Sequence, residues 1–248
     1  VVDALFQIQG GYALVMLTQN TLIGVRDPFG IRPLVIGKIN DSYVFASETC
    51  ACDIIGATFG RAGDKGEIVY IENGKLNSIR PFPPKKIRPC VFEYIYFSRP
   101  DSILNGECAY EYRKRLGAEL AKETKIDADL VVPVPDSGNA AAIGFSKHTG
   151  KNFDLGLIRN HYVGRTFIEP AHKIRSLGVK LKLNANKSSI KNKKIVLIDD
   201  SLVRGTTSHK IVKMLYDAGA KEVHMGIACP QIRLSLIHIW RCRRRPLC

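Results

Sequence analysis

The residues best suited to chemistry are two adjacent carboxylates followed by a loop of hydroxyls and glycine. Asp199 and Asp200 come directly after the apolar run 195–198, whose β-branched residues predict a short buried strand. Backbone N–H groups and the positive end of a helix dipole favour an anion at the start of the helix that follows. The carboxylates repel phosphate, but they suit ribose hydroxyls and a shared divalent cation. The pattern predicts a site for a sugar phosphate with magnesium, formed by Asp199, Asp200, Ser201, Arg204, Gly205, Thr206 and Thr207.

Acids at the end of a strand are common in α/β proteins, and many of them bind only a structural water. For the two aspartates alone, this simpler interpretation stays open. The full run 195–207, I-V-L-I-D-D-S-L-V-R-G-T-T, is much more specific. It resembles the phosphoribosyl pyrophosphate (PRPP) signature of type I phosphoribosyltransferases. The resemblance implies that this loop binds PRPP and that Asp199 and Asp200 hold Mg²⁺.

A second candidate loop, P-D-S-G, lies between a predicted strand at 129–135 and a predicted helix at 140–147. Ligands of open α/β sheets collect at the carboxyl ends of the strands. Asp136, Ser137 and Gly138 are therefore candidates for binding the pyrophosphate of PRPP. Taken alone, the tetrapeptide is more typical of a simple turn, and only the neighbouring signature makes it a candidate site.

The polar segment 159–194 supplies cations between two predicted strands. Its first part, 159–170, has Gly164 as a hinge candidate and is either a lid or disordered. Displacement of pyrophosphate from PRPP requires neutralisation of the leaving group, exclusion of water and positioning of the nucleophile. Arg165, Arg175 and Lys182 are candidates for that neutralisation. The alternative is a solvated basic face.

The other elements predict an α/β protein with a β-rich first part. Strands are expected at 12–18, 22–25, 34–37, 42–46, 67–71 and 75–79, with turns at Asn40–Asp41 and Asn73–Gly74. A Pro-rich stretch then suggests an interdomain linker. After it come a helix at 109–124 and alternating strands and helices, with strands at 154–158 and 223–229 and a helix over 211–218. Repeated βα units with continuous apolar strands predict a doubly wound parallel sheet.

The bulk properties narrow the class of protein. The 248 residues carry seven cysteines and a net charge of +14, but no apolar run approaches the roughly 18 residues that span a bilayer. Nothing resembles a secretory signal, so a cytoplasmic protein with reduced thiols and no membrane partner is expected. The last fifteen residues, 234–248, hold four arginines and are interpreted as a non-native tail. A basic tail that binds RNA or membrane is the alternative.

Further stretches are similar to the amidophosphoribosyltransferase family of purine synthesis. They are R-D-P-F-G-I-R-P-L (26–34), A-S-E-T (46–49), F-E-Y-I-Y-F-S-R-P-D-S (92–102), Y-V-G-R-T-F (162–167) and K-L-N-A-N (182–186). The resemblance implies the C-terminal part of an N-terminal-nucleophile glutaminase sandwich at 1–86 and a phosphoribosyltransferase domain at 87–233. Ammonia from glutamine then reacts with PRPP to give phosphoribosylamine and pyrophosphate. Tyr162, Arg165 and Lys182 are the implied catalytic residues, and a homo-oligomer is implied for the intact protein.

The chain departs from the family pattern at several positions. The family's glutaminase nucleophile is an N-terminal cysteine, whereas residue 1 is Val1, so no glutamine hydrolysis is expected from this chain. Gly138 replaces a serine that some relatives carry, and His161 replaces an arginine of the lid. Cys90 matches one ligand of a [4Fe–4S] cluster in one branch of the family, but a single thiolate cannot hold a cluster.

Two other functions compete with this interpretation. A PRPP-binding transcriptional regulator would use the basic charge to bind nucleic acid, but it should carry a DNA-binding module where this chain has hairpins. A salvage phosphoribosyltransferase would use a purine base, and the stretches at 92–102 and 162–167 disfavour it. Nucleic acid is therefore not expected as a partner. The expected ligands are PRPP, Mg²⁺, ammonia or glutamine, and pyrophosphate.

Overall fold

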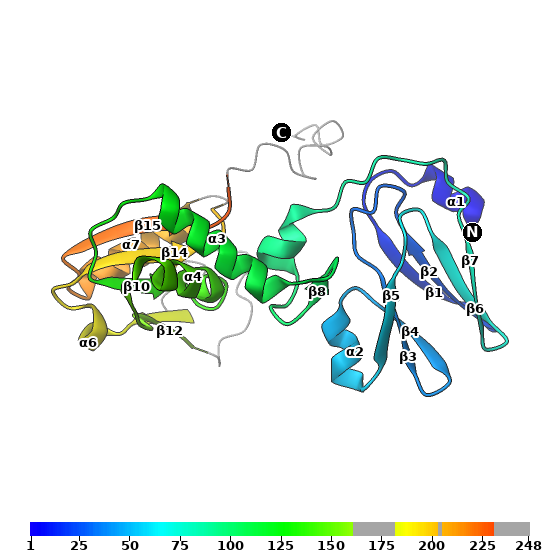
Figure 1. The fold of residues 1–248 in the computed structure, drawn as a ribbon, viewed down its shortest axis with the longest axis horizontal. Coiled ribbons are helices and arrows are strands. Elements are labelled where there is room, and N and C mark those ends of the chain that lie inside the picture. Colours follow the sequence, from blue (N-terminus) through cyan, green and yellow to red (C-terminus); the bar gives the residue numbers. More distant parts are fainter. Residues whose placement is uncertain (161–181, 203–204, 231–248) are drawn as a thin grey trace, which may run out of the picture. The chain divides into compact units, whose positions relative to one another are not determined.

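The chain folds into two compact units, shown in Figure 1. The computed structural model describes residues 1–160, 182–202 and 205–230, and for Thr206 it describes the backbone alone. The described residues of the first unit are Val1–Ala109, and the second unit is Tyr110–Pro230. The predicted domain boundary after residue 86 lies inside the first unit and stays a prediction. The predicted tail lies outside the described residues.

The first unit is built on two antiparallel sheets (Figure 1). In the four-stranded sheet the order is β1-β2-β6-β7, and in the three-stranded sheet it is β4-β3-β5. The strands are β1 (Ala13–Leu17), β2 (Thr21–Arg26), β3 (Val35–Ile39), β4 (Ser42–Ala46), β5 (Thr58–Ala62), β6 (Ile68–Glu72) and β7 (Lys75–Ile79). The two hairpins predicted from the sequence are confirmed. Asn73 and Gly74 both have positive φ, 51° and 71°, which the two-residue turn of a hairpin requires.

A helix lies against each sheet of the first unit. Leu5 of α1 (Val2–Gln7) packs with Val25 and Ile68 of the four-stranded sheet. Cys52 of α2 (Thr49–Ile55) packs with Val35 of the other sheet. On the opposite side of β2, a Cβ on Gly24 would lie 3.0 Å from the ring of Phe45 on β4. The two sheets therefore meet at this glycine, in agreement with the predicted antiparallel sandwich.

Residues 85–105 are bound to the first unit by hydrogen bonds. The N–H groups of Arg88 and Cys90 donate to the carbonyls of Phe29 and Ile31 over 2.8 and 3.2 Å. The end of the Pro-rich stretch is therefore hydrogen-bonded to the loop after β2, and its role as an interdomain linker stays a prediction. Beyond it lie a π-helix, η1 (Glu93–Phe97), and the short strands β8 (Ile103–Leu104) and β9 (Glu107–Cys108).

Two of the stretches that carry the family resemblance, 26–34 and 46–49, both bind a third, 92–102. The carboxylate of Asp27 accepts hydrogen bonds from the backbone amides of Phe29, Ile31 and Arg32, which closes the loop after β2. Arg32 then forms an ion pair of 2.5 Å with the buried Glu93. In the same way, Glu48 accepts hydrogen bonds from the Ser102 hydroxyl and the Arg99 amide, at 2.6 and 2.7 Å. These residues stabilise the fold of the first unit.

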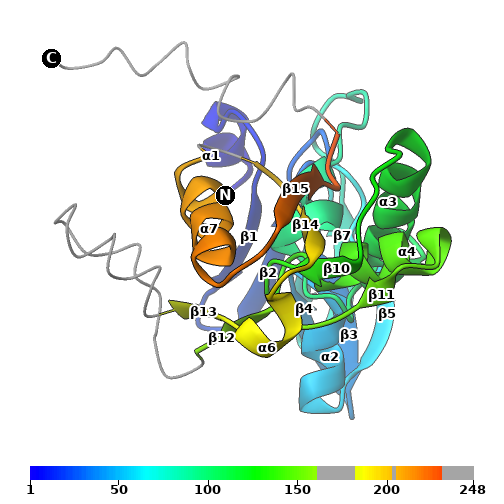
Figure 2. The same ribbon diagram turned by 90° about the vertical axis from the view of Figure 1, so that its left-hand side faces the viewer.

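The second unit contains a parallel sheet with the strand order β11-β10-β14-β15. Helices α3 and α4 lie on one side of the sheet and α7 on the other, as Figure 2 shows. This arrangement confirms the predicted doubly wound α/β sheet. The elements are α3 (Ala109–Glu123), β10 (Leu130–Pro133), α4 (Asn139–Thr149), β11 (Asn152–Phe153), β12 (Leu157–Arg159), β13 (Leu183–Ala185), α6 (Lys187–Ile190), β14 (Lys194–Asp199), α7 (Thr206–Asp217) and β15 (Glu222–Ile227).

Strand β14 forms the centre of the second core because both of its faces are covered. Successive side chains of a strand point to opposite faces. Ile195 and Leu197 pack on the α7 side, whereas Val196 and Ile198 pack on the α3 and α4 side. All four side chains are fully buried. The continuous apolar run in the sequence is therefore a buried parallel strand, as predicted.

Two glycines let α3 and α4 cross in direct backbone contact. A Cβ on Gly117 would lie 1.8 Å from the carbonyl oxygen of Ala141, and one on Gly144 would lie 1.9 Å from that of Lys114. Neither distance leaves room for a side chain. The crossing therefore fixes the position of α4, whose first residue follows the P-D-S-G loop.

The strand predicted at 154–158 is wrong in its partner and its extent. The parallel sheet takes only Asn152 and Phe153, and the chain then turns at Asp154–Gly156. A Cβ on Gly156 would lie 2.8 Å from the side chain of Val132, so the turn packs tightly under the sheet. Strand β12 then pairs antiparallel with β13. An aspartate and a glycine at a turn explain why the apolar residues are divided between two sheets.

Candidate functional site

The two loops predicted to bind ligand lie side by side at the carboxyl edge of the parallel sheet. Strands β10 and β14 pair directly, and the amide of Val134 donates to the carbonyl of Ile198 over 2.8 Å. The Ser137 hydroxyl donates to Oδ1 of Asp199 at 3.3 Å, which joins the P-D-S-G loop to the signature loop. The prediction that these loops meet at one edge of the sheet agrees with this geometry.

The two aspartates are mostly removed from solvent. Burial, and then the neighbouring charge of Asp200, raises the pKa of Asp199 to about 6. Asp200 is 7% exposed, and burial also raises its pKa. Its Oδ1 accepts a hydrogen bond of 2.9 Å from the Ser201 hydroxyl. Its Oδ2 is buried and has no hydrogen-bond partner among the described residues.

An unsatisfied buried carboxylate oxygen is costly, so it favours a ligand that donates hydrogen bonds or carries positive charge. Ribose hydroxyls and a hard cation both meet that requirement. Among the described residues, no three His, Cys, Asp or Glu side chains gather as a metal site. A magnesium ion at Asp199 and Asp200 would therefore need ligand oxygens to complete its coordination, as is usual for Mg²⁺ bound to phosphates.

Gly205 begins the helix behind the carboxylates. Its φ of 71° lies in the left-handed region, where other residues are strained. The amide of His209 donates to the Gly205 carbonyl at 3.0 Å, and this bond starts the α-helical ladder of α7. The amides of the first turn of a helix have no partner within the helix, so they are available to an anion. Thr207 is exposed in this turn, whereas Thr206 contributes backbone alone to the description.

Gly138 is required by close packing rather than by its backbone conformation. Its φ is −79°, which any residue adopts, but a Cβ would lie 2.3 Å from the carbonyl oxygen of Ile198. A serine at this position would require a shift of the main chain. Gly138 thus brings the P-D-S-G loop against β14, and it offers a ligand only backbone groups.

Charged residues lie on both sides of the P-D-S-G loop. Asp136 forms an ion pair with Arg159, the last residue of β12. Burial, and then the charge of Arg159, lowers the pKa of Lys182, which precedes β13. Arg159 was not singled out from the sequence, although it opens the polar segment. Arg113 is buried on α3, and its charge offsets part of the rise in the pKa of Asp200; no sequence pattern indicated this residue.

Several predicted site residues are not part of the described structure. Tyr162, Arg165, Arg175 and Arg204 lie outside the described residues, and so does His161. Their proposed roles remain predictions. Asp136, Ser137, Gly138, Lys182, Asp199, Asp200, Ser201, Gly205 and Thr207 are described, and the bond between Ser137 and Asp199 joins the two groups.

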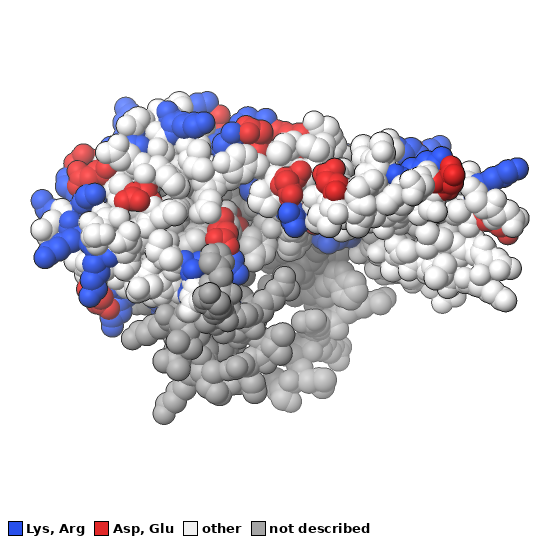
Figure 3. Space-filling model, turned by 90° about the horizontal axis from the view of Figure 1, so that it is seen from below, with Lys and Arg blue, Asp and Glu red and all other residues white. Residues whose placement is uncertain are grey.

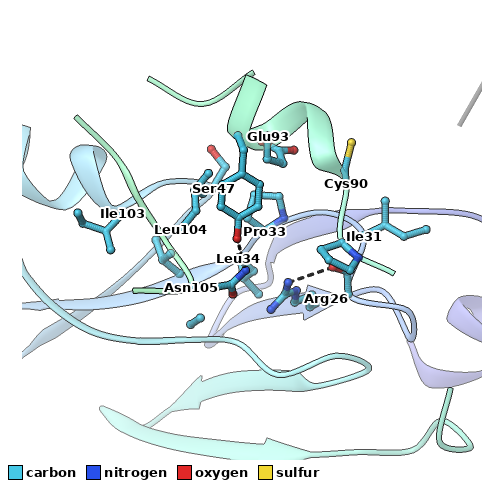
Figure 4. A pocket seen from close by; sticks show the side chains of 15 residues that line it. Arg26, Ile31, Pro33, Leu34, Ser47, Cys90, Glu93, Ile103, Leu104 and Asn105 are labelled. Atoms are coloured by element: carbon cyan, nitrogen blue, oxygen red, sulfur yellow. Dashed lines mark hydrogen bonds between the residues drawn. The ribbon is translucent and has the colours of Figure 1, made fainter. Parts of the chain in front are cut away.

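A concave region of the first unit contains Cys90, the predicted iron–sulfur ligand. Figure 4 shows this pocket, which is lined mainly by apolar side chains such as Ile31, Leu34 and Leu104. The guanidinium of Arg26 at its base donates to three backbone carbonyls, so its donors serve the fold. Cys90 is a partly buried free thiol. The described residues alone do not fit a cluster, because no three His, Cys, Asp or Glu side chains among them gather as a metal site.

The surface charge is mixed on the face drawn in Figure 3. Lys and Arg side chains alternate there with Asp and Glu and with wide neutral areas. None of the described helices combines the length and apolar character needed to cross a bilayer.

Comparison with known proteins places the chain in a family. A model of the glutamine amidotransferase domain matches residues 1–53. The amidophosphoribosyltransferase of Rhizobium etli is 52% identical over 236 residues, which are 93% of this chain and 48% of that protein. The chain belongs to the amidophosphoribosyltransferase family. The Synechocystis member is 53% identical over 234 residues, covering 93% of this chain and 47% of its own length.

Two solved structures have the same fold over the part that this chain covers. The glutamine PRPP amidotransferase of B. subtilis, complexed with ADP and GMP, matches with a TM-score of 0.86 and 46% identity. The match covers 94% of this chain and 51% of that one. An allosteric regulatory enzyme of purine biosynthesis matches with a TM-score of 0.84, 48% identity and coverage of 92% and 49%. The family resemblance and the fold class predicted from the sequence are confirmed. This chain spans about half the length of these amidophosphoribosyltransferases.

Proposed function

We propose that this chain carries the PRPP site of an amidophosphoribosyltransferase of purine biosynthesis. The whole enzyme forms 5-phosphoribosylamine and pyrophosphate from PRPP, with ammonia that comes from glutamine. The observation that carries the proposal is the hydrogen bond between Ser137 and Asp199, because it joins a pyrophosphate-loop candidate to a ribose-binding candidate. Relatives that are about half identical and bear this enzyme's name add to the proposal.

In this proposal each part of the site binds one part of PRPP. Asp199 and Asp200 accept hydrogen bonds from the ribose hydroxyls, which satisfies the orphan oxygen of Asp200. The amides at the start of α7 bind the 5-phosphate. The backbone of residues 136–138 binds the pyrophosphate, since Gly138 lets the loop approach β14 closely. Lys182 supplies a cation for the leaving group.

Magnesium fits this site as a metal shared between protein and ligand. Asp199 and Asp200 would hold it, and both supply the hard oxygen ligands that Mg²⁺ prefers. When bound, the ion would neutralise charge on the pyrophosphate. The protein's own residues orient the ribose and limit access of water to the reacting carbon, because Asp199 and Asp200 lie largely out of solvent.

Calorimetry with the full chain tests the proposal. PRPP titrated in the presence of Mg²⁺ should bind, and the double change of Asp199→Asn and Asp200→Asn should abolish the heat. Asp127→Asn is the matched control, because this exposed carboxylate pairs with Lys194 at the opposite end of β14. Absence of a PRPP signal from the wild-type chain, with its folded circular dichroism spectrum intact, would refute the assignment.

The nucleophile separates this enzyme from salvage transferases. With ammonium salt as the nitrogen source, the chain should release pyrophosphate from PRPP, whereas adenine, guanine and uracil should give no turnover. Turnover of a purine base would instead support the salvage alternative.

We also propose that the enzyme is cytoplasmic. Free thiols are typical of that compartment, and the described cysteines are free: Cys50, Cys52, Cys90, Cys108 and Cys229.

A further inference from the structure

The P-D-S-G loop presents a carboxylate where an anionic ligand is proposed to bind. Asp136 lies three residues after the end of β10, and its side chain is about half exposed. A carboxylate repels pyrophosphate, so the side chain of Asp136 is a poor ligand for it. The predicted binding of PRPP at Asp136 is therefore assigned to its backbone and not to its carboxylate.

The ion pair with Arg159 provides the missing positive charge. Arg159 ends β12, and its guanidinium binds Oδ2 of Asp136. Both side chains remain about half exposed, at 46% and 52%, so an incoming ligand has access to them. An exposed pair of this kind is weak, which means that a stronger anion can displace the carboxylate.

The position of Arg159 also suits pyrophosphate. The charge of Arg159 contributes to the lowered pKa of Lys182, so the two cations lie close together. The amide of Asn160, which follows Arg159, donates to the Lys182 carbonyl at 2.7 Å. Two cations and one carboxylate thus gather beside the loop. A guanidinium binds phosphate oxygens in a bidentate manner, and a pyrophosphate carries more charge than one carboxylate.

We propose that Arg159 is a pyrophosphate-binding residue and that Asp136 is its counter-ion only while the site is empty. This inference rests on the proposed function, since it names a further residue of the same site. When pyrophosphate binds, the guanidinium exchanges the Asp136 carboxylate for phosphate oxygens. Asp136 therefore competes with the ligand, and it keeps the empty loop electrically neutral.

If Asp136 competes with the ligand, substitutions of Asp136 and of Arg159 should change the affinity for pyrophosphate in opposite directions. In calorimetric titration of the full chain with magnesium pyrophosphate, Asp136→Asn should tighten binding by about twofold to fivefold, because the competitor is removed. Arg159→Gln should weaken binding by about tenfold or more, because a charge-assisted bond is lost. Arg159→Lys should fall between the wild type and Arg159→Gln, since it keeps the charge without the fork of donors.

A second ion pair provides matched controls. Asp127 and Lys194 form an ion pair at the amino end of β14, away from the two loops. Asp127→Asn and Lys194→Gln change the net charge by the same amounts and should leave binding unchanged. Thermal unfolding midpoints should be equal for all variants, which separates binding from folding.

The alternative is that the ion pair between Asp136 and Arg159 only stabilises the conformation of the P-D-S-G loop. In that case Asp136→Asn and Arg159→Gln would both weaken binding, and this common sign would overturn the inference. Unchanged binding in both variants would overturn it as well. If the wild-type chain binds PRPP but these variants are silent, the inference fails and the proposed function stands. If the wild type binds neither PRPP nor magnesium pyrophosphate, the proposed function fails first.

Discussion

The buried carboxylate of Glu67 should contribute more to the stability of the first unit than the carboxylates on the surface of that unit. Its side chain is 1% exposed and accepts four hydrogen bonds. Two come from the guanidinium of Arg61 on β5, at 2.7 and 2.8 Å. The others come from the Ser78 hydroxyl on β7 and the Asp64 amide, both at 2.6 Å. Glu67 therefore connects strands of the two different sheets.

The magnitude follows from the pKa of Glu67. Burial alone raises this pKa, but the bonds from Arg61, Ser78 and Asp64 outweigh burial and lower it from 4.5 to about 2. A shift of that size corresponds to about 3 kcal/mol of stability near neutral pH. Arg61 is 41% exposed, so solvent screens part of this interaction. Glu67→Gln should therefore lower the free energy of unfolding by about 2 kcal/mol.

Urea denaturation at several pH values measures the effect. A carboxylate with a lowered pKa stabilises the fold above pH 4.5, and this contribution is lost as the pH falls toward 2. The difference between the wild type and Glu67→Gln should thus be constant at neutral pH and shrink below pH 4.5. Glu72→Gln, at the exposed end of β6, the strand that begins directly after Glu67, is the control and should have no such effect. A deficit that stays the same down to pH 3 would refute the electrostatic origin.

Further predictions concern the PRPP site and the hydrogen bonds between Glu48 and residues 99–102. Gly138→Ala should lower the free energy of unfolding of the second unit by about 2 kcal/mol, because its Cβ would clash with β14. Gly205→Ala should lower it by about 1 kcal/mol, because alanine is strained at the positive φ of this position. Urea denaturation measures both differences. Removal of Mg²⁺ with a chelator should abolish the calorimetric signal of PRPP, and restored Mg²⁺ should return it. Ser102→Ala should cost about 1 kcal/mol by removing its bond to Glu48, and hydrogen exchange should increase at Arg99, whereas equal exchange in both proteins would contradict this role.

Much of the fold was predictable because local signals agreed with long-range packing. The run at 195–198 is apolar without alternation, and both faces of β14 are buried. Asn73–Gly74 marks its hairpin by the conformations that these two residues adopt readily. By contrast, the turn at Gly156 depends on contact with Val132 from a distant strand. A pattern limited to neighbouring residues carries no information about such a contact.

The candidate site was predictable to a similar degree. Loops that follow adjacent parallel strands must meet at one edge, so Ser137 and Asp199 were expected to approach each other. The counter-charges were not predictable, because Arg159 and Arg113 reach the site from β12 and α3. The sequence comparison treated Gly138 only as the replacement of a serine found in relatives. The structure gives the physical reason for a glycine, because the carbonyl of Ile198 leaves no room for a side chain.

The crossing of α3 and α4 has a consequence for genetics. Gly117 and Gly144 touch no proposed ligand, yet any side chain there would wedge the helices apart and displace the start of α4. A random screen for inactive variants should therefore recover substitutions at these two glycines together with those at the aspartates. Such alleles would look like active-site lesions in an activity assay while every ligand-contacting residue remained intact.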